Sequence, residues 1–174
     1  MIKWIAFVIA SLGILIGSWD SFHRPLSHGF FRFFAFESLL ILILSNLDDW
    51  FDDPFSPLHL ISWLFLLSSI LLAGTSFALL KIFGRPEGQI ELTTRLVQEG
   101  TYRYLRHPLY SSLLLLGVGT FLKRVDVTGS SLLIGEIAFL ITTARIEEEE
   151  NVRKFGQTYL DYMHRTKMFI PFLV

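Results

Sequence analysis

Residues 58–83 read LHLISWLFLLSSILLAGTSFALLKIF, and this stretch has no charged residue before Lys81. A helix rises about 1.5 Å per residue and the hydrocarbon core of a bilayer is about 30 Å thick, so about 20 apolar residues suffice to cross it. The apolar residues surround the expected helix, whereas those of a soluble amphipathic helix line one face. The stretch therefore predicts a membrane-spanning helix.

Four further apolar stretches predict spans at about residues 1–19, 30–47, 107–122 and 128–144. The 174-residue chain is 52% hydrophobic, with a mean hydropathy of +0.50, which exceeds the usual value for a soluble domain. We therefore expect an all-α, multi-pass membrane bundle of about five spans, followed by a C-terminal helix outside the membrane, as a single domain over residues 1–174. A signal peptide at residues 1–19 is the weaker alternative, because no small-residue cleavage site precedes a soluble domain.

Basic residues predict the orientation of the chain, because they collect in cytosolic loops. With the first residue outside, the inside segments hold two, five and five of the 15 lysines and arginines, which leaves three outside. The two longest polar segments, residues 84–110 and 145–174, then both lie at the cytosolic face. No lipidation or retention signal is visible, so a bacterial cytoplasmic membrane is the expected location.

Several classes of site and partner are excluded or disfavoured by composition. The chain has no cysteine, which excludes disulfides, thiolate metal sites and cysteine nucleophiles. A net charge of -1 argues against a nucleic-acid partner, which requires a basic surface. We predict no metal site, because His23 and His28 supply only two ligands and the acidic residues 48–53 lack the glycine and glutamate of a calcium loop.

The first polar segment leads into the predicted fourth span and reads LVQEGTYRYLRHPLY over residues 96–110. Gly100 permits a tight turn, and Pro108 suits the first turn of a helix, where its missing N–H has no partner to lose. The free backbone N–H groups at that helix start favour an anionic ligand group beside Arg106 and His107. An interfacial anchor is the alternative role for these two side chains.

The second polar segment opens with four consecutive glutamates, residues 147–150, at the end of the last predicted span. Carboxylates at a helix C-terminus oppose the helix dipole, so at least one is expected to have a specific partner such as a cationic ligand. A solvated helical face is the alternative for an acidic run. Successive helical residues point about 100° apart, so only one or two of the four can face a common pocket.

Together these two segments resemble the five-span membrane methyltransferases, which include isoprenylcysteine carboxyl methyltransferases and phospholipid N-methyltransferases. The resemblance covers roughly the C-terminal half and rests on Leu96, Val97, Gly100, Tyr102, Arg106, His107, Pro108, Tyr110, Glu147, Glu148, Phe155, Gly156, Tyr159, Tyr162, Ile170 and Pro171. One position departs, because the isoprenylcysteine enzymes have an arginine before the glutamate pair where this chain has Thr143. Arg145 points about 200° away from that position, which counts against an isoprenylcysteine acceptor.

The resemblance implies a methyltransferase that uses S-adenosylmethionine and acts on a lipid or small lipophilic acceptor at the cytosolic membrane face. The cofactor-binding residues implied by the family pattern are Thr94, Arg95, Leu96, Val97, Tyr102, His107, Pro108, Leu109, Tyr110 and Glu147. We predict Arg106 and Glu148 as the catalytic residues, and Glu148 is also the second candidate, after Glu147, for cofactor contact. The acceptor, the glutamate that acts as a base and the oligomeric state stay open.

Two other functions stay open as well. A sterol-reductase-like oxidoreductase with a nicotinamide cofactor is similar near its C-terminus, although its longer series of spans is missing here. A nonenzymatic membrane subunit for assembly or transport is expected to have more polar residues within its spans. Glu37 and Glu136 are the acidic residues found there, and we expect both to lie close enough to helix ends to be solvated.

Overall fold

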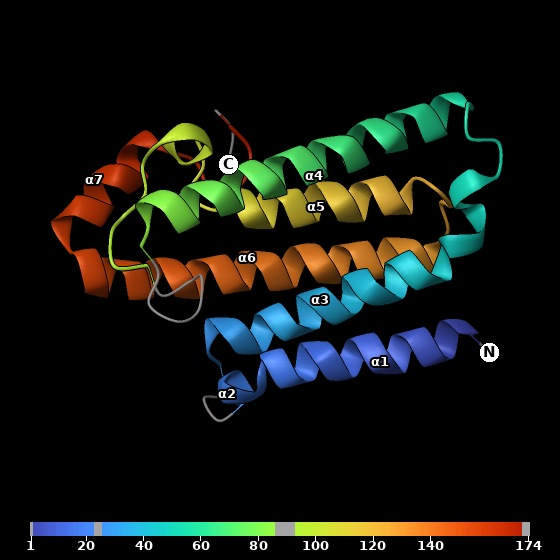
Figure 1. Cartoon of the computed structure of the whole chain (residues 1–174), viewed down its shortest axis with the longest axis horizontal. Helices are drawn as coiled ribbons and strands as arrows, with labels where there is room; N and C mark the ends of the chain where they lie inside the picture. Colours follow the sequence, from blue (N-terminus) through green and yellow to red (C-terminus); the bar gives the residue numbers. More distant parts are fainter. Residues whose placement is uncertain (1, 23–25, 86–92, 172–174) are drawn as a thin grey trace. The chain divides into compact units, whose positions relative to one another are not determined.

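A computed structural model describes residues 2–22, 26–85 and 93–171, and it consists of helices joined by loops (Figure 1). The helices are α1 (Ile2–Gly17), α2 (Trp19–Phe22), α3 (His28–Ser45), α4 (Pro57–Phe83), α5 (Pro108–Phe121), α6 (Val127–Phe155) and α7 (Gln157–Arg165), with 3-10 turns at Leu47–Phe51 and Gly100–Arg103. Across the described ranges, extended pairing is limited to isolated bridges such as that between Leu105 and Lys167. The prediction of an all-α fold is confirmed.

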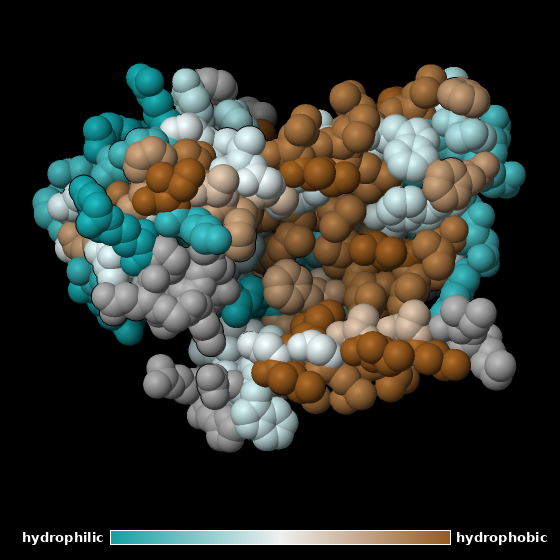
Figure 2. Space-filling model, in the orientation of Figure 1, coloured by the Kyte–Doolittle hydropathy of each residue, from teal (hydrophilic) through white to brown (hydrophobic). Residues whose placement is uncertain are grey.

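Three helices, α3, α4 and α6, are long and apolar enough to cross a membrane. Large apolar side chains such as Ile9 on α1 and Leu64 and Leu71 on α4 are exposed. Figure 2 shows that hydrophobic residues cover much of one face of the molecule. These features confirm a membrane helical bundle. Two apolar helices, α1 and α5, are shorter, so the number of five spans stays a prediction.

The ends of the helices follow from particular residues. Ser27 caps α3, because its hydroxyl accepts a hydrogen bond from the Phe30 N–H at 3.3 Å. The Asp126 carboxylate does the same at the start of α6, where Gly129 N–H donates to it at 2.6 Å. Gly156 separates α6 from α7 with a φ of 58°, a backbone conformation that favours glycine. This turn allows the chain after α6 to fold back as α7.

The chain divides into two compact units, residues 1–66 with 114–147 and residues 67–113 with 148–174. In the first unit, α1 lies beside α3 (Figure 1). The rings of Phe34 on α3 and Phe139 on α6 have centroids 5.5 Å apart, and Ser62 donates a hydrogen bond to the Gly119 carbonyl at 2.6 Å. The candidate site lies in the second unit. The expectation of a single domain over residues 1–174 stays a prediction.

The prediction that Glu136 is solvated is wrong. Glu136 lies well inside α6 and is 0% exposed, and the described residues give its carboxyl oxygens no hydrogen bond. Gly117 on α5 makes room for it, since a Cβ atom there would lie 2.1 Å from Glu136 Oε2. Glu37 is partly buried instead of solvated and accepts a hydrogen bond from Ser11 at 2.9 Å.

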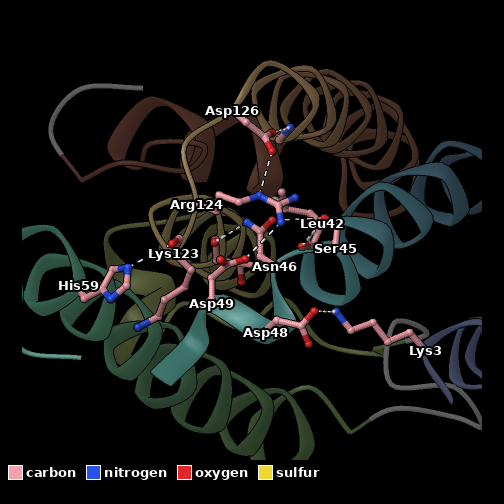
Figure 3. A network of polar contacts seen from close by, with 12 residues as sticks. Lys3, Leu42, Ser45, Asn46, Asp48, Asp49, His59, Lys123, Arg124 and Asp126 are labelled. Atoms are coloured by element: carbon pink, nitrogen blue, oxygen red, sulfur yellow. Dashed lines mark hydrogen bonds and ion pairs between the residues drawn. The ribbon is translucent and has the colours of Figure 1, made fainter. Parts of the chain in front are cut away.

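A polar network joins loops and helix ends within the first unit (Figure 3). Its ion pairs are Lys3–Asp48 at 2.5 Å, Arg124–Asp49 at 3.2 Å and Arg124–Asp126 at 2.9 Å. The buried His59 ring lies between two backbone carbonyls, with Nδ1 3.0 Å from Asp53 O and Nε2 3.1 Å from Lys123 O. Two carboxylates of the acidic loop, Asp48 and Asp49, are therefore ion-paired.

Candidate active site

A nearly buried ion pair lies at the centre of the candidate site. Arg106, just before α5, donates from Nε to Glu148 Oε1 at 2.5 Å, and the two side chains are 11% and 9% exposed. His107 Nε2 lies 3.3 Å from the same oxygen. Both contacts are made by Oε1. The Glu148 carboxylate therefore lies between a guanidinium and an imidazole.

Glu148 lies beyond the apolar stretch of α6, in the charged part that begins at Arg145. Burial raises the pKa of the Glu148 carboxyl, whereas hydrogen bonds and charge from His107 and Arg106 lower it, and the lowering prevails. Glu148 is therefore a carboxylate at neutral pH. Among the four glutamates Glu148 is the buried one, Glu147 and Glu150 are half-buried, and Glu149 is exposed.

Two aromatic side chains pack against His107, which contacts this carboxylate. The His107 ring stacks on Tyr110, one helical turn later, with centroids 5.5 Å apart and planes 14° apart. The Phe169 ring lies 6.1 Å from His107. Aromatic faces and a carboxylate both attract cations, so this arrangement suits a positively charged ligand group.

Tyr162 on α7 holds the loop that carries Tyr102. Its hydroxyl oxygen lies 2.6 Å from the Tyr102 carbonyl oxygen and 3.1 Å from that of Leu105, and it donates to them. Burial raises the pKa of the Tyr162 phenol well above its usual value, so the phenol keeps its proton and remains a donor. Tyr102 itself is buried, at 6% exposed.

The remaining predicted residues lie in different environments. Val97 and Pro108 are buried, and Leu96 and Leu109 are half-buried. Thr94 and Arg95 are exposed, and the Thr94 hydroxyl donates to the Arg85 carbonyl of its own loop. Some residues of the predicted polar segments, 86–92 and 172–174, lie outside the described residues, as does His23. Within the described ranges, no three histidine, aspartate or glutamate side chains are grouped so that they can hold a metal ion.

Sequence reasoning missed the partners that residues 163–169 supply to the site. Arg106 Nη1 donates to the backbone carbonyls of Thr166 at 2.6 Å and Met163 at 3.3 Å. Ser111 Oγ donates to the Phe169 carbonyl at 2.8 Å. Carbonyl oxygens belong to every residue, so the sequence contains no signal that distinguishes these acceptors.

A known protein family matches the central part of the chain, which contains Arg106, His107 and Glu148. Residues 58–158 match the sequence model described as phospholipid methyltransferase. The chain belongs to the phospholipid methyltransferase family. The matched residues contain Arg106, His107 and Glu148, and the predicted family is confirmed.

One curated relative is Protein-S-isoprenylcysteine O-methyltransferase B of Arabidopsis thaliana. This chain is 32% identical to it over 108 residues. The aligned region covers 61% of this chain and 52% of the relative. The chain thus spans about half the length of the curated relative that it matches.

Proposed function

We propose that this protein is a membrane methyltransferase that uses S-adenosylmethionine and methylates a lipid or small lipophilic acceptor. The observation that carries the proposal is the Glu148 carboxylate, which is nearly buried, contacts Arg106 and His107 through Oε1 and lies within the matched family region. S-adenosylmethionine has a sulfonium and an ammonium group. Both are cations, and both suit a carboxylate that contacts His107, the ring against which Tyr110 and Phe169 pack.

The proposed cofactor site keeps the residues that the family pattern implies. These are Thr94, Arg95, Leu96, Val97, Tyr102, His107, Pro108, Leu109, Tyr110 and Glu147. Within this set, His107 contacts Glu148 and Tyr110 stacks on His107, while the Tyr162 hydroxyl connects the Tyr102 loop to α7. We propose that Glu147 contacts the ammonium group of the cofactor.

When bound, S-adenosylmethionine supplies an electrophilic methyl group. The protein then contributes mainly proximity, orientation and exclusion of water, because an in-line displacement needs little covalent help. The Glu148 carboxylate can accept a proton from an amine acceptor, since it is ionised at neutral pH. Arg106 keeps Glu148 in place, both for contact with the cationic cofactor and for proton transfer.

We place the site at the cytosolic membrane face, supported by the basic residues of its polar segments. The charged cofactor then arrives from the cytosol, and an apolar acceptor enters from the bilayer. Thr143 is 0% exposed and its hydroxyl bonds to the Phe139 carbonyl of its own helix. It therefore offers no substitute for the arginine of the isoprenylcysteine enzymes, which favours a different acceptor.

The test is transfer of a labelled methyl group from S-adenosylmethionine by the purified protein in lipid nanodiscs. The acceptors offered in parallel are a phosphatidylethanolamine, a prenylcysteine analogue and a lipophilic thiol. We expect labelled product with one acceptor class, weak or no product with prenylcysteine, and loss of product in Glu148→Gln. Product that forms equally well with Glu148→Gln contradicts the proposed site, and Glu149→Gln serves as the exposed control.

A further inference from the structure

We propose that residues 166–169 form a strap that positions the candidate site, and that Arg106 is a positioning residue that acts through this strap and through Glu148. The inference rests on the proposed function, because it concerns the same site. It assigns the guanidinium to protein partners and leaves the ligand to Glu148, His107 and the aromatic rings.

The strap pairs with the residues just before α5 through the main chain. Lys167 N donates to Tyr104 O at 3.0 Å, Arg106 N to Lys167 O at 2.8 Å and His107 N to Met168 O at 3.2 Å. Together they form a short parallel bridge. The backbone N–H groups of Arg106 and His107, which precede the start of α5, therefore donate to the strap.

Side chains fasten the strap at both ends. At one end Arg106 Nη1 donates to Thr166 O, and the Thr166 hydroxyl donates to Tyr162 O at 2.6 Å. At the other end Ser111 Oγ donates to Phe169 O at 2.8 Å and lies 3.1 Å from His107 O. The strap is thus fixed to α5 and α7 within the second unit.

Arg106 joins this strap to Glu148. Its planar guanidinium donates to the Glu148 carboxylate on one edge and to the Thr166 and Met163 carbonyls on another. Its positive charge is offset by Glu148, and its side chain is only 11% exposed. The same guanidinium therefore fixes the Glu148 oxygen that faces His107. A shift of the strap moves the guanidinium and, with it, the Glu148 carboxylate.

Two matched pairs of variants test the strap. Lys167→Pro removes the N–H that bonds to Tyr104 O, whereas Lys167→Ala keeps it and removes only an exposed side chain. Ser111→Ala removes the donor to Phe169 O, whereas Ser112→Ala removes a hydroxyl that bonds to Leu109 O within its own helix. The ligand is S-adenosylhomocysteine, titrated by calorimetry against the full chain in nanodiscs.

We expect Lys167→Pro and Ser111→Ala each to weaken S-adenosylhomocysteine binding by roughly three- to tenfold, the equivalent of one hydrogen bond. Lys167→Ala and Ser112→Ala should change it less than twofold. Equal affinities within each pair overturn the strap. If Lys167→Pro does not fold, the serine pair alone decides the outcome.

A spectroscopic readout separates positioning from general loosening of the fold. The chain has five histidines, so ¹⁵N-histidine labelling gives a simple spectrum. The His107 ring signals should shift in Lys167→Pro and not in Lys167→Ala, while the His59 signals stay in place. An unmoved His107 signal, or equal shifts at both histidines, overturns the positioning role.

The role of Arg106 is tested by combining Arg106→Lys with Lys167→Pro. If Arg106 acts through the strap, the double variant should have about the same S-adenosylhomocysteine affinity as the single variant that binds more weakly. If the two losses of affinity multiply, Arg106 contacts the ligand directly, which overturns its positioning role.

Wild-type protein that does not bind S-adenosylhomocysteine overturns the proposed function itself. Normal binding by the wild type, with strap variants that bind equally well, overturns only this inference.

Discussion

Arg106 and Glu148 lie 42 residues apart in the sequence and form an ion pair with Nε 2.5 Å from Oε1. The pair joins the start of α5 to the charged end of α6. Both side chains are about nine-tenths buried, so removing one of them leaves the other charge without its partner in a poorly solvated place. The pair therefore links the stability of the protein to the charge of its candidate site.

Replacement of the buried glutamate is expected to affect both stability and ligand binding. Glu148→Gln keeps the shape and removes the charge that offsets Arg106, so we expect the free energy of unfolding to fall by about 1.5–3 kcal/mol. S-adenosylhomocysteine affinity should fall at least about tenfold. Glu149, with a side chain 71% exposed, provides the control, and Glu149→Gln should change stability by less than about 0.5 kcal/mol. Similar effects in both variants would show that net charge matters and position does not.

Glu147 is predicted to act on the ligand without a comparable effect on the fold. It is half-buried and precedes Glu148 in α6. Glu147→Gln should abolish most methyl transfer and weaken S-adenosylhomocysteine binding, because it removes a negative charge from the proposed ammonium contact. The melting temperature should stay close to that of the wild type. Unchanged binding would remove Glu147 from the cofactor site.

The orientation of the chain can be measured with single cysteines, since the protein has none of its own. Cysteines at the exposed positions Asp52 and Gln157 should react with a membrane-impermeant maleimide from opposite sides, with residue 157 reacting from the cytosol. The reason is the uneven distribution of lysine and arginine between the loops. Reaction of both cysteines from one side is incompatible with five spans.

A glycine on α5 is expected to be essential for packing. A Cβ atom at Gly117 would lie 2.1 Å from Glu136 Oε2, whereas one at Gly74 meets nothing within 4 Å. Gly117→Ala should therefore lower the free energy of unfolding by about 1–3 kcal/mol, while Gly74→Ala should not. Unfolding in mixed detergent micelles measures the difference. Adding Glu136→Ala to Gly117→Ala should restore part of the loss, and failure to do so argues against this contact as the cause.

Hydropathy predicted the membrane helices because length and polarity are local properties of the sequence. The stretch at residues 58–83 corresponds to α4, Pro57–Phe83. The predicted span at 128–144 is shorter than α6, which continues to Phe155. The count of apolar residues shows where the membrane-spanning part ends, but it does not show where the helix ends. The glutamates and basic residues that follow are good helix formers, so α6 continues beyond the span.

The candidate site was predictable only where side chains have a distinctive chemistry. The sequence singled out Arg106, His107 and the glutamate run, and the family pattern ranked Glu147 before Glu148 for cofactor contact. Helical spacing shows that the glutamates differ, but it does not show which one meets Arg106. Sequence reasoning also missed the burial of Glu136, since the space beside this side chain depends on Gly117 in another helix. Such contacts depend on how the helices pack, which local patterns do not encode.

The central claim, that this membrane protein binds S-adenosylmethionine for methyl transfer, is tested most directly by calorimetric titration of the purified protein with S-adenosylhomocysteine and, separately, with NADPH. We predict saturable binding of S-adenosylhomocysteine that Glu148→Gln weakens, and no binding of NADPH. Binding of NADPH without binding of S-adenosylhomocysteine would contradict the account and favour a sterol-reductase-like oxidoreductase.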